Sequence, residues 1–266
     1  MIEAVSLDLS PIKPEATLER ELAYYERAYG SYIPGLFAQP AVVQFRHYLV
    51  KRILGATGAG AQSRILSIGC GIGDTELLLA PHVGHVTGVD LSPVAIREAR
   101  RAAAAHGISN VHFAAGGWQT LRLFDVPFDT VVAIFFLHHL PAEDLRAFPG
   151  QLKKVLHAGG IFYSLDPSAR RLSGFLGELL VPKLMRKHQT DDEHPLLPQS
   201  TAAEFRAEGF ETVTRWFDFT STPIAGLFPS WKAAYRVGRL LDEGLTRVPL
   251  LRQLSSNFEL IGRRPK

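Results

Sequence analysis

A short apolar run that breaks into three glycines constrains this chain more than any other segment. Residues 65–68 read Ile-Leu-Ser-Ile, which is typical of a buried strand, and Gly69, Gly71 and Gly73 follow at alternate positions. Asp74 then opens a run with helical character. A strand, a glycine-rich turn and a helix bring the backbone close to a nucleotide-like ligand, because a Cβ at the glycines would hold the ligand away. The segment therefore predicts an α/β fold with a ligand site at this turn.

Strand and helix patterns alternate from residue 64 to residue 166, which indicates a doubly wound, mostly parallel sheet. Two later strands predict an antiparallel edge, so that seven strands are expected in all. Ser92 and Pro93 fit the cap and first residue of one helix, and Gly159 and Gly160 fit the stop of another. The expected strands are 64–68, 86–90, 110–114, 130–136, 161–165, 211–219 and 257–262, and the expected helices are 74–81, 93–106, 142–156 and 201–208.

The segments outside this alternation are predicted to be additions to a single domain over residues 1–266. The N-terminal segment should form a helical cap in which Pro34 and Pro40 separate at least two helices. A Gly/Ala-rich turn from Gly55 to Gly60 should lead into the first strand. The expected parts are the cap over 1–60, the core over 61–168, substrate-side helical insertions that form a lid over 169–200 and 222–254, and the last strands over 201–221 and 255–266.

Composition excludes several classes of protein. Hydrophobic residues make up 46% and charged residues 21% of the 266, which is ordinary for a soluble domain, and the longest apolar runs are too short to cross a bilayer. The net charge of +3 is too small to predict nucleic-acid binding by itself, and no aromatic–basic strip is visible. The single cysteine, Cys70, forms neither an internal disulfide nor a cysteine-based zinc site. With no signal-peptide pattern at the start, a reducing cytoplasm is expected.

Further segments narrow the class of ligand that the turn can bind. Asp74 stands where a dinucleotide fingerprint needs its third glycine, and its charge suits a cationic ligand better than a pyrophosphate, which argues against a nicotinamide dehydrogenase. Asp90 ends the second strand, residues 135–140 read FFLHHL, and residues 152–160 lead to a glycine pair. With the sequence ILSIGCGIG of the turn, these segments match in order and spacing over about residues 60–166. The set resembles the class I S-adenosylmethionine-dependent methyltransferases, of the type that acts on small molecules.

The resemblance implies that the chain binds S-adenosylmethionine and leaves S-adenosylhomocysteine. The three glycines would line the methionine portion, and Asp90 would accept hydrogen bonds from both ribose hydroxyls. The alternative is a structural role in which Asp90 only caps the next helix. Trp118 would lie against the adenine or, alternatively, pack in the core. The expected cofactor residues are Gly69, Cys70, Gly71, Gly73, Asp90, Leu91, Gly117, Trp118 and Phe135.

One departure from the family pattern concerns the methionine end of the cofactor. The family usually has Asp where this chain has Ser67, so the ammonium group has less negative charge beside it. An N-terminal tyrosine or Asp74 is expected to help. Backbone groups near Gly117 would replace the acid that often meets the adenine amino group.

Methyl transfer requires alignment of the acceptor, exclusion of water and, for a hydroxyl, removal of a proton. No metal is expected. His138, at the end of the fourth strand, is the candidate general base, and the alternative is that His138 and His139 only pack. The expected acceptor-side residues are Tyr24, Tyr25, His139 and Trp231. Asp166 reads as a strand-terminating turn or an acceptor contact. The cluster His188, Asp191, Asp192, Glu193 and His194 reads as a solvated loop rather than a metal site.

Taken together, these features predict an enzyme that methylates a small, hydrophobic or aromatic acceptor, with O-methylation favoured, in secondary-metabolite or lipid- and quinone-like biosynthesis. An RNA or protein methyltransferase and a non-catalytic cofactor-binding partner subunit are the alternatives. The expected partner is the small-molecule acceptor, with no nucleic acid and no transmembrane segment. A monomer or a homodimer is expected, and the basic residues around 175–181 do not by themselves support peripheral membrane contact.

Overall fold

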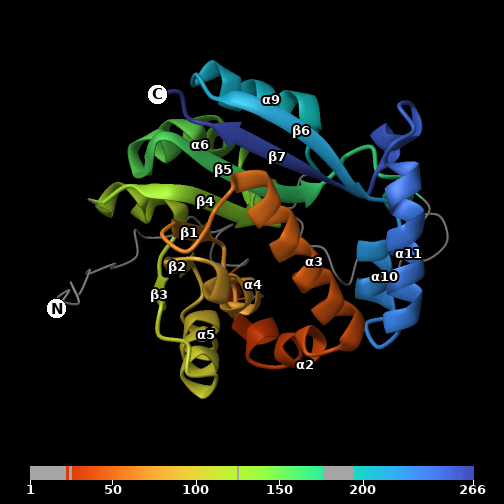
Figure 1. The fold of residues 1–266 in the computed structure, drawn as a ribbon, viewed down its shortest axis with the longest axis horizontal. Helices are drawn as coiled ribbons and strands as arrows, with labels where there is room; N and C mark the ends of the chain where they lie inside the picture. The colour runs from red at the N-terminus through yellow and green to blue at the C-terminus, as the bar shows by residue number, and fades with distance from the viewer. Residues whose placement is uncertain (1–21, 24–25, 125, 176–194) are drawn as a thin grey trace.

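A seven-stranded sheet forms the centre of the molecule, which was obtained as a computed structural model that describes residues 22–23, 26–124, 126–175 and 195–266 (Figure 1). The strand order is β3-β2-β1-β4-β5-β7-β6. The pairs β1–β2, β2–β3, β1–β4 and β4–β5 are parallel, whereas β7 is antiparallel to both β5 and β6. The predicted doubly wound, Rossmann-like α/β fold with an antiparallel edge is confirmed.

The element boundaries follow the predicted pattern closely. The strands are β1 (Arg64–Ile68), β2 (His85–Asp90), β3 (Val111–Ala115), β4 (Phe128–Ile134), β5 (Leu156–Pro167), β6 (Glu211–Asp218) and β7 (Asn257–Arg263). The α-helices are α2 (Ile33–Phe37), α3 (Pro40–Thr57), α4 (Asp74–Leu79), α5 (Pro93–Ala105), α6 (Ala142–Val155), α9 (Pro198–Ala207), α10 (Ser221–Leu227) and α11 (Lys232–Leu245). Short 3₁₀ helices are η1 (Ala80–His82), η2 (Trp118–Leu123), η3 (Leu137–His139) and η4 (Leu251–Leu254).

Two glycine assignments from the sequence are wrong. Gly159 and Gly160 do not stop α6, because that helix ends at Val155 and both glycines lie inside the long strand β5, where Gly159 has a φ of 80°. The turn expected to begin at Gly55 begins later, because α3 continues to Thr57. Gly58, in the left-handed conformation with a φ of 68°, ends α3 as a typical C-terminal glycine.

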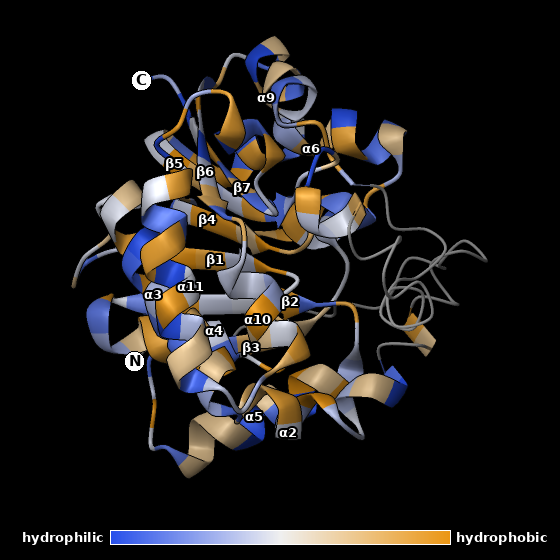
Figure 2. Ribbon diagram, turned by 90° about the vertical axis from the view of Figure 1, so that its right-hand side faces the viewer, coloured by the Kyte–Doolittle hydropathy of each residue, from blue (hydrophilic) through white to orange (hydrophobic). Residues whose placement is uncertain are grey.

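Helices cover both faces of the sheet. On one face α3 buries Phe45, Leu49 and Ile53 against strand residues such as Ile65 and Tyr163. On the other face α6 and α9 pack their apolar side chains against the opposite sides of the same strands. The central strands are therefore hydrophobic along their length, as Figure 2 shows in orange, which is typical of a sheet buried on both faces.

The carboxyl ends of the parallel strands meet at one edge of the sheet. Ile68 of β1 pairs with Val89 of β2 and with Ala133 of β4, and Ala133 pairs with Ser164 of β5. The residues that follow these positions therefore approach one another, although they are far apart in the sequence. Open α/β sheets bind ligands at this edge. Among the described helices, none combines the length and the apolar character needed to cross a membrane.

Candidate functional site

The three glycines of the turn after β1 have backbone conformations that residues other than glycine rarely adopt. Gly69, Gly71 and Gly73 have φ angles of 70°, 54° and 76°. The amide of Gly69 donates to the carbonyl oxygen of Val89 at 2.8 Å, which ties the turn to β2. A Cβ on Gly69 would lie 2.9 Å from the ring of Phe136. Glycine is thus required at this turn both by backbone conformation and by space.

Asp90 braces the same turn. Its carboxylate accepts hydrogen bonds from the amide of Gly71 at 2.8 Å and from the amide of Ser92 at 2.9 Å. The side chain of Ser92, not that of Asp90, caps α5 by accepting from the amide of Ala95 at 3.2 Å, as predicted. The capping alternative for Asp90 is therefore wrong. Because each carboxylate oxygen accepts more than one hydrogen bond, this geometry is compatible with additional hydroxyl donors.

A carboxylate lies beside Ser67, although not on the strand. The hydroxyl of Ser67 donates to Oε1 of Glu76, on α4, at 2.6 Å, and the Glu76 residue is only 2% exposed. Oε2 of Glu76 is buried and accepts no hydrogen bond from the described residues. Burial, and then the negative charge of Asp74, raise the pKa of Glu76 to about 7. Glu76 was not predicted from the sequence. An acidic residue within the apolar run of α4 could have indicated it.

Asp74 forms an ion pair with Arg46 of α3. The guanidinium of Arg46 also lies over the ring of Phe37, 4.7 Å from its centroid. Burial raises the pKa of Asp74, and Arg46 opposes that rise. Because Arg46 offsets part of the charge of Asp74, that charge alone does not distinguish between cationic and anionic ligands. The absence of the third glycine remains the argument against a dinucleotide.

A tyrosine from the N-terminal segment covers the glycine turn. The hydroxyl oxygen of Tyr29 lies 3.0 Å from the position that a Cβ on Gly71 would occupy. Tyr24 and Tyr25, which were expected on the acceptor side, lie outside the described residues. The structure therefore brings Tyr29 to the position expected for an N-terminal tyrosine.

The loop after β3 lies beside Asp90. The amide of Gly116 donates to the carbonyl oxygen of Asp90 at 2.9 Å. A Cβ on Gly117 would lie 3.8 Å from Cδ1 of Leu91. Leu91 and Gly117 are thus neighbours beside Asp90, and the buried Cys70 lies in the turn itself.

Trp118 packs mainly against the core. Its indole nitrogen donates to Oδ2 of Asp144 at 3.4 Å, and its ring meets Phe148 edge to face with centroids 5.8 Å apart. These contacts favour the packing alternative over a role against the adenine.

Phe135 is the one described non-glycine residue with a positive φ, 53°, and it follows directly after β4. Its amide donates to the carbonyl oxygen of Leu165 at 2.8 Å, and its ring stacks with that of Phe45 at 6.1 Å. Such backbone strain persists only where surrounding contacts hold it, and it is frequent at functional sites. Phe135 therefore marks the carboxyl end of β4 as a constrained part of the site.

His138 and Asp166 form a buried pair at this edge. Nδ1 of His138 lies 3.0 Å from Oδ1 of Asp166, and the backbone amide of His138 donates to the same oxygen at 3.3 Å. The side chain of His138 is 8% exposed, that of Asp166 is fully buried, and the ring of His139 lies 4.1 Å from that of His138. When Nδ1–H donates to Asp166, Nε2 is the basic nitrogen of a neutral imidazole. A base oriented by a carboxylate is suited to accept a proton.

Other candidates lie elsewhere. Trp231 stacks on Phe228 and is 60% exposed, and the cluster of residues 188–194 lies outside the described residues. No group of metal-ligating side chains is found among the residues that the structure describes. A cavity of about 530 Å³ lies at the β6 edge, lined by Arg52 and Arg215 among others, and is not formed by the glycine turn.

Comparison with known proteins places the core in a family. Residues 65–160 match the family model of a methyltransferase domain. An uncharacterized methyltransferase, YcgJ of Bacillus subtilis, is 32% identical over 106 residues, which are 40% of this chain and 41% of the relative. An S-adenosyl-L-methionine-dependent Diels-Alderase, iccD of Talaromyces variabilis, is 36% identical over 146 residues, 53% of this chain and 49% of the relative. The chain thus spans about half the length of these relatives.

A third relative is matched over more of its length. The demethylmenaquinone methyltransferase of Staphylococcus aureus is 27% identical over 191 residues, 66% of this chain and 76% of the relative.

Solved structures share the fold. The YcgJ crystal structure has a TM-score of 0.56 at 21% identity and covers 83% of this chain and 99% of its own. Magnesium protoporphyrin IX methyltransferase from Synechocystis, solved with bound S-adenosylhomocysteine, has a TM-score of 0.63 at 15% identity, with 93% and 99% covered. The sheet order and the glycine turn agree with this match, and residues 65–160 are similar to the methyltransferase domain family.

Proposed function

We propose that this chain transfers the methyl group of S-adenosylmethionine to a hydroxyl of a small, hydrophobic acceptor, with His138 as the general base. The observation that carries the proposal is the buried contact between His138 and Asp166 at the carboxyl ends of β4 and β5. The sulfonium supplies an activated methyl group, so the protein must mainly orient the acceptor, exclude water and take up the hydroxyl proton. A hydrogen-bonded imidazole in a water-poor site is suited to the last of these tasks.

The residues around the turn fit the cofactor. The three glycines are proposed to line its methionine part, and Asp90 is proposed to accept hydrogen bonds from the ribose hydroxyls. Glu76 is proposed to supply the negative charge that Ser67 lacks, which places a carboxylate below the turn to attract the cofactor ammonium. The orphaned Oε2 of Glu76 supports this role, because a buried carboxylate oxygen without a donor is costly.

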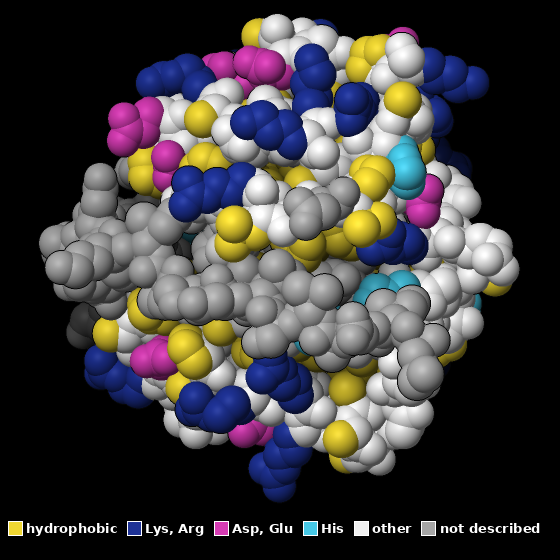
Figure 3. All heavy atoms as spheres, turned by 90° about the vertical axis from the view of Figure 1, so that its left-hand side faces the viewer, with side chains coloured by type: hydrophobic (Ala, Val, Ile, Leu, Met, Phe, Trp, Pro, Cys, Tyr) yellow, Lys and Arg dark blue, Asp and Glu magenta, His cyan; other side chains and the backbone are white. Residues whose placement is uncertain are grey.

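The acceptor is proposed to be apolar because aromatic side chains gather near the end of β4. Phe135 stacks with Phe45, and Phe136 lies against Gly69. One relative is named as a demethylmenaquinone methyltransferase, and one protein of similar fold as a magnesium protoporphyrin IX methyltransferase. Basic side chains on the face shown in Figure 3 are scattered rather than gathered into a strip, which offers no support for a nucleic-acid acceptor.

The test is S-adenosylhomocysteine release by the purified chain over a panel of phenols, carboxylic acids, amines and carbon acids. Release with phenols, together with a loss of at least about a hundredfold in kcat/KM for His138→Gln, is expected if His138 is the base. The matched control is His157→Gln, because His157 is an exposed residue of β5. Equal rates in both variants would refute the role of His138, and turnover with amines alone would refute O-methylation.

A second candidate is cofactor-dependent cyclisation without methyl transfer. It is favoured by the 36% identity to the Diels-Alderase iccD. In the same assay, a polyene substrate that isomerises while S-adenosylhomocysteine stays absent would identify this activity.

A further inference from the structure

The helix α11 is oriented opposite to an ordinary surface helix. A surface helix normally turns its apolar stripe to the core and its charged stripe to solvent. In α11 the buried positions are Tyr235, Gly238, Arg239 and Asp242, so two charged side chains face the protein. Of the apolar residues that remain, Val237, Leu240 and Leu241 are exposed.

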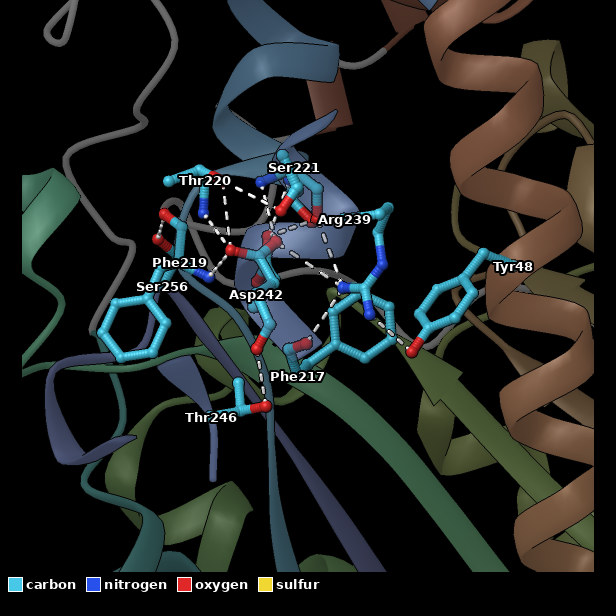
Figure 4. A network of polar contacts seen from close by, with 12 residues as sticks. Tyr48, Phe217, Phe219, Thr220, Ser221, Arg239, Asp242, Thr246 and Ser256 are labelled. Atoms are coloured by element: carbon cyan, nitrogen blue, oxygen red, sulfur yellow. Dashed lines mark hydrogen bonds and ion pairs between the residues drawn. The ribbon is translucent and has the colours of Figure 1, made fainter. Parts of the chain in front are cut away.

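A polar network holds α11 in this orientation (Figure 4). The carboxylate of Asp242 accepts hydrogen bonds from the amides of Phe219, Thr220 and Ser221, each at 3.0 Å. Arg239 donates to the hydroxyl of Tyr48 at 2.6 Å and lies near Asp242, with 3.6 Å between Nη1 and Oδ2. Rotation of α11 to bury its apolar side would break these contacts in a buried environment.

The outward side of α11 carries an apolar stripe, defined here as Val237, Leu240 and Leu241. These residues are spaced by three and four positions and thus share one side of the helix. They are 57%, 70% and 55% exposed. Further exposed apolar residues stand before and after these positions in the chain, namely Leu227, Phe228, Trp231, Val248, Leu250 and Leu254.

The charges around the stripe are mostly positive. Over residues 226–254 the exposed charged residues are the four cations Lys232, Arg236, Arg247 and Arg252 and the single anion Glu243, because Arg239 and Asp242 are buried. Exposed aromatic and aliphatic side chains beside Lys and Arg are typical of helices that lie in the interface of an anionic bilayer. The helices α10 and α11 lie at one side of the molecule, outside α3 (Figure 1).

We propose that the α10–α11 surface docks on a bilayer that contains anionic lipids, with the apolar stripe inserted at the headgroup boundary. The charge pattern favours lipid over a second copy of this chain. In a symmetric dimer the same patch meets itself, which would bring the four cations of each copy together. A bilayer with anionic headgroups instead complements them. The proposal does not depend on methyl transfer.

The test is co-sedimentation of the full chain, without cofactor or acceptor, with vesicles of phosphatidylcholine alone or mixed with phosphatidylglycerol. Binding is expected to be at least about tenfold stronger to the mixed vesicles and to weaken with salt. The variant L240E/L241E should lose at least about tenfold of this binding. The control V126E/V213E adds the same charges at apolar positions outside this surface, which are 50% and 51% exposed, and should bind like the unaltered chain.

Three outcomes would overturn the proposal. They are no binding to either vesicle, equal binding to both, and equal loss in the control. A dimer in sedimentation velocity that L240E/L241E dissociates, without vesicle binding, would assign the surface to a second copy. Cofactor affinity measured on each variant shows that it is folded, and it separates failure of docking from failure of the proposed activity.

Discussion

Replacement of Glu76 by Gln should remove a pH dependence of stability that the structure predicts. The pKa of Glu76 is raised from 4.5 to about 7, first by burial and then by Asp74. At about 1.4 kcal/mol for each pKa unit, ionisation of Glu76 costs the folded state about 3 kcal/mol. The pKa of Glu76 is higher in the folded than in the unfolded chain. The folded state therefore keeps its full stability below pH 4.5 and loses about 3 kcal/mol of it as the pH rises through 7. Gln keeps an acceptor for Ser67 and does not ionise.

Urea unfolding of both proteins, without cofactor, at pH 5 and at pH 8.5 measures this effect. The free energy of unfolding of Glu76→Gln relative to the unaltered chain should rise by about 2–3 kcal/mol between the two values, because a part of the effect is already present at pH 5. A relative stability that is the same at both pH values would refute the argument, because burial would then not oppose the charge.

Cofactor binding tests the second part of the reasoning about Glu76. An ammonium beside the carboxylate favours its ionised form, so S-adenosylmethionine should bind the unaltered chain more tightly as the pH rises from 6 to 8. Calorimetry should show this trend lost and the affinity lowered in Glu76→Gln, and the affinity restored in the double variant S67D/E76Q, which moves the carboxylate to the strand. Methylthioadenosine, which lacks the amino acid part, is the control ligand. An equal loss for both ligands would contradict an ammonium contact.

The other predictions concern residues of the site and of the polar network. Asp90→Ala should weaken cofactor binding by at least about 1 kcal/mol in calorimetry, because it removes charged acceptors, and unchanged affinity would exclude the ribose role. Asp166→Asn should lower kcat far more than it raises KM, because it changes how His138 is held. It should also shift the limb of the pH–rate profile on which the rate rises with pH. An unchanged profile would exclude a positioning role. Asp242→Ala should lower the free energy of unfolding by about 3 kcal/mol, because it leaves a buried Arg and several amides without an acceptor. Glu243→Ala, at an exposed neighbouring position, should stay within about 0.5 kcal/mol of the unaltered chain.

Local patterns in the sequence predicted the fold well because the strands and helices are short, regular and separated by clear turn residues. The glycine turn was predicted for the same reason, since it lies directly after an apolar strand, and Asp90 was expected at the end of the next strand. Ser92 was likewise confirmed as a helix cap. What these features share is that their physical cause lies within a few residues of the chain.

Contacts between distant segments were predicted poorly. Nothing near Asp166 in the sequence indicates that it holds His138, which is 28 residues away and lies in η3, after the neighbouring strand β4. Glu76 meets Ser67 only because α4 returns over the turn, and Tyr29 reaches the turn from a helix before the core. The order β5-β7-β6 was also beyond the local pattern, which indicated an antiparallel edge but not which strand lies inside.

The position of β7 has a consequence for how the molecule assembles. β6 joins the sheet only through β7, which lies between it and β5 and pairs with both. Glu259 of β7 is buried and accepts a hydrogen bond from the hydroxyl of Tyr163 at 2.6 Å. During synthesis, β5 and β6 therefore stay unpaired along these edges until residues 257–263 have emerged. The pairing of β7 with β5 closes a long loop and is therefore slow, so this step should limit the rate of folding. Until it occurs, two open strand edges are exposed to other chains.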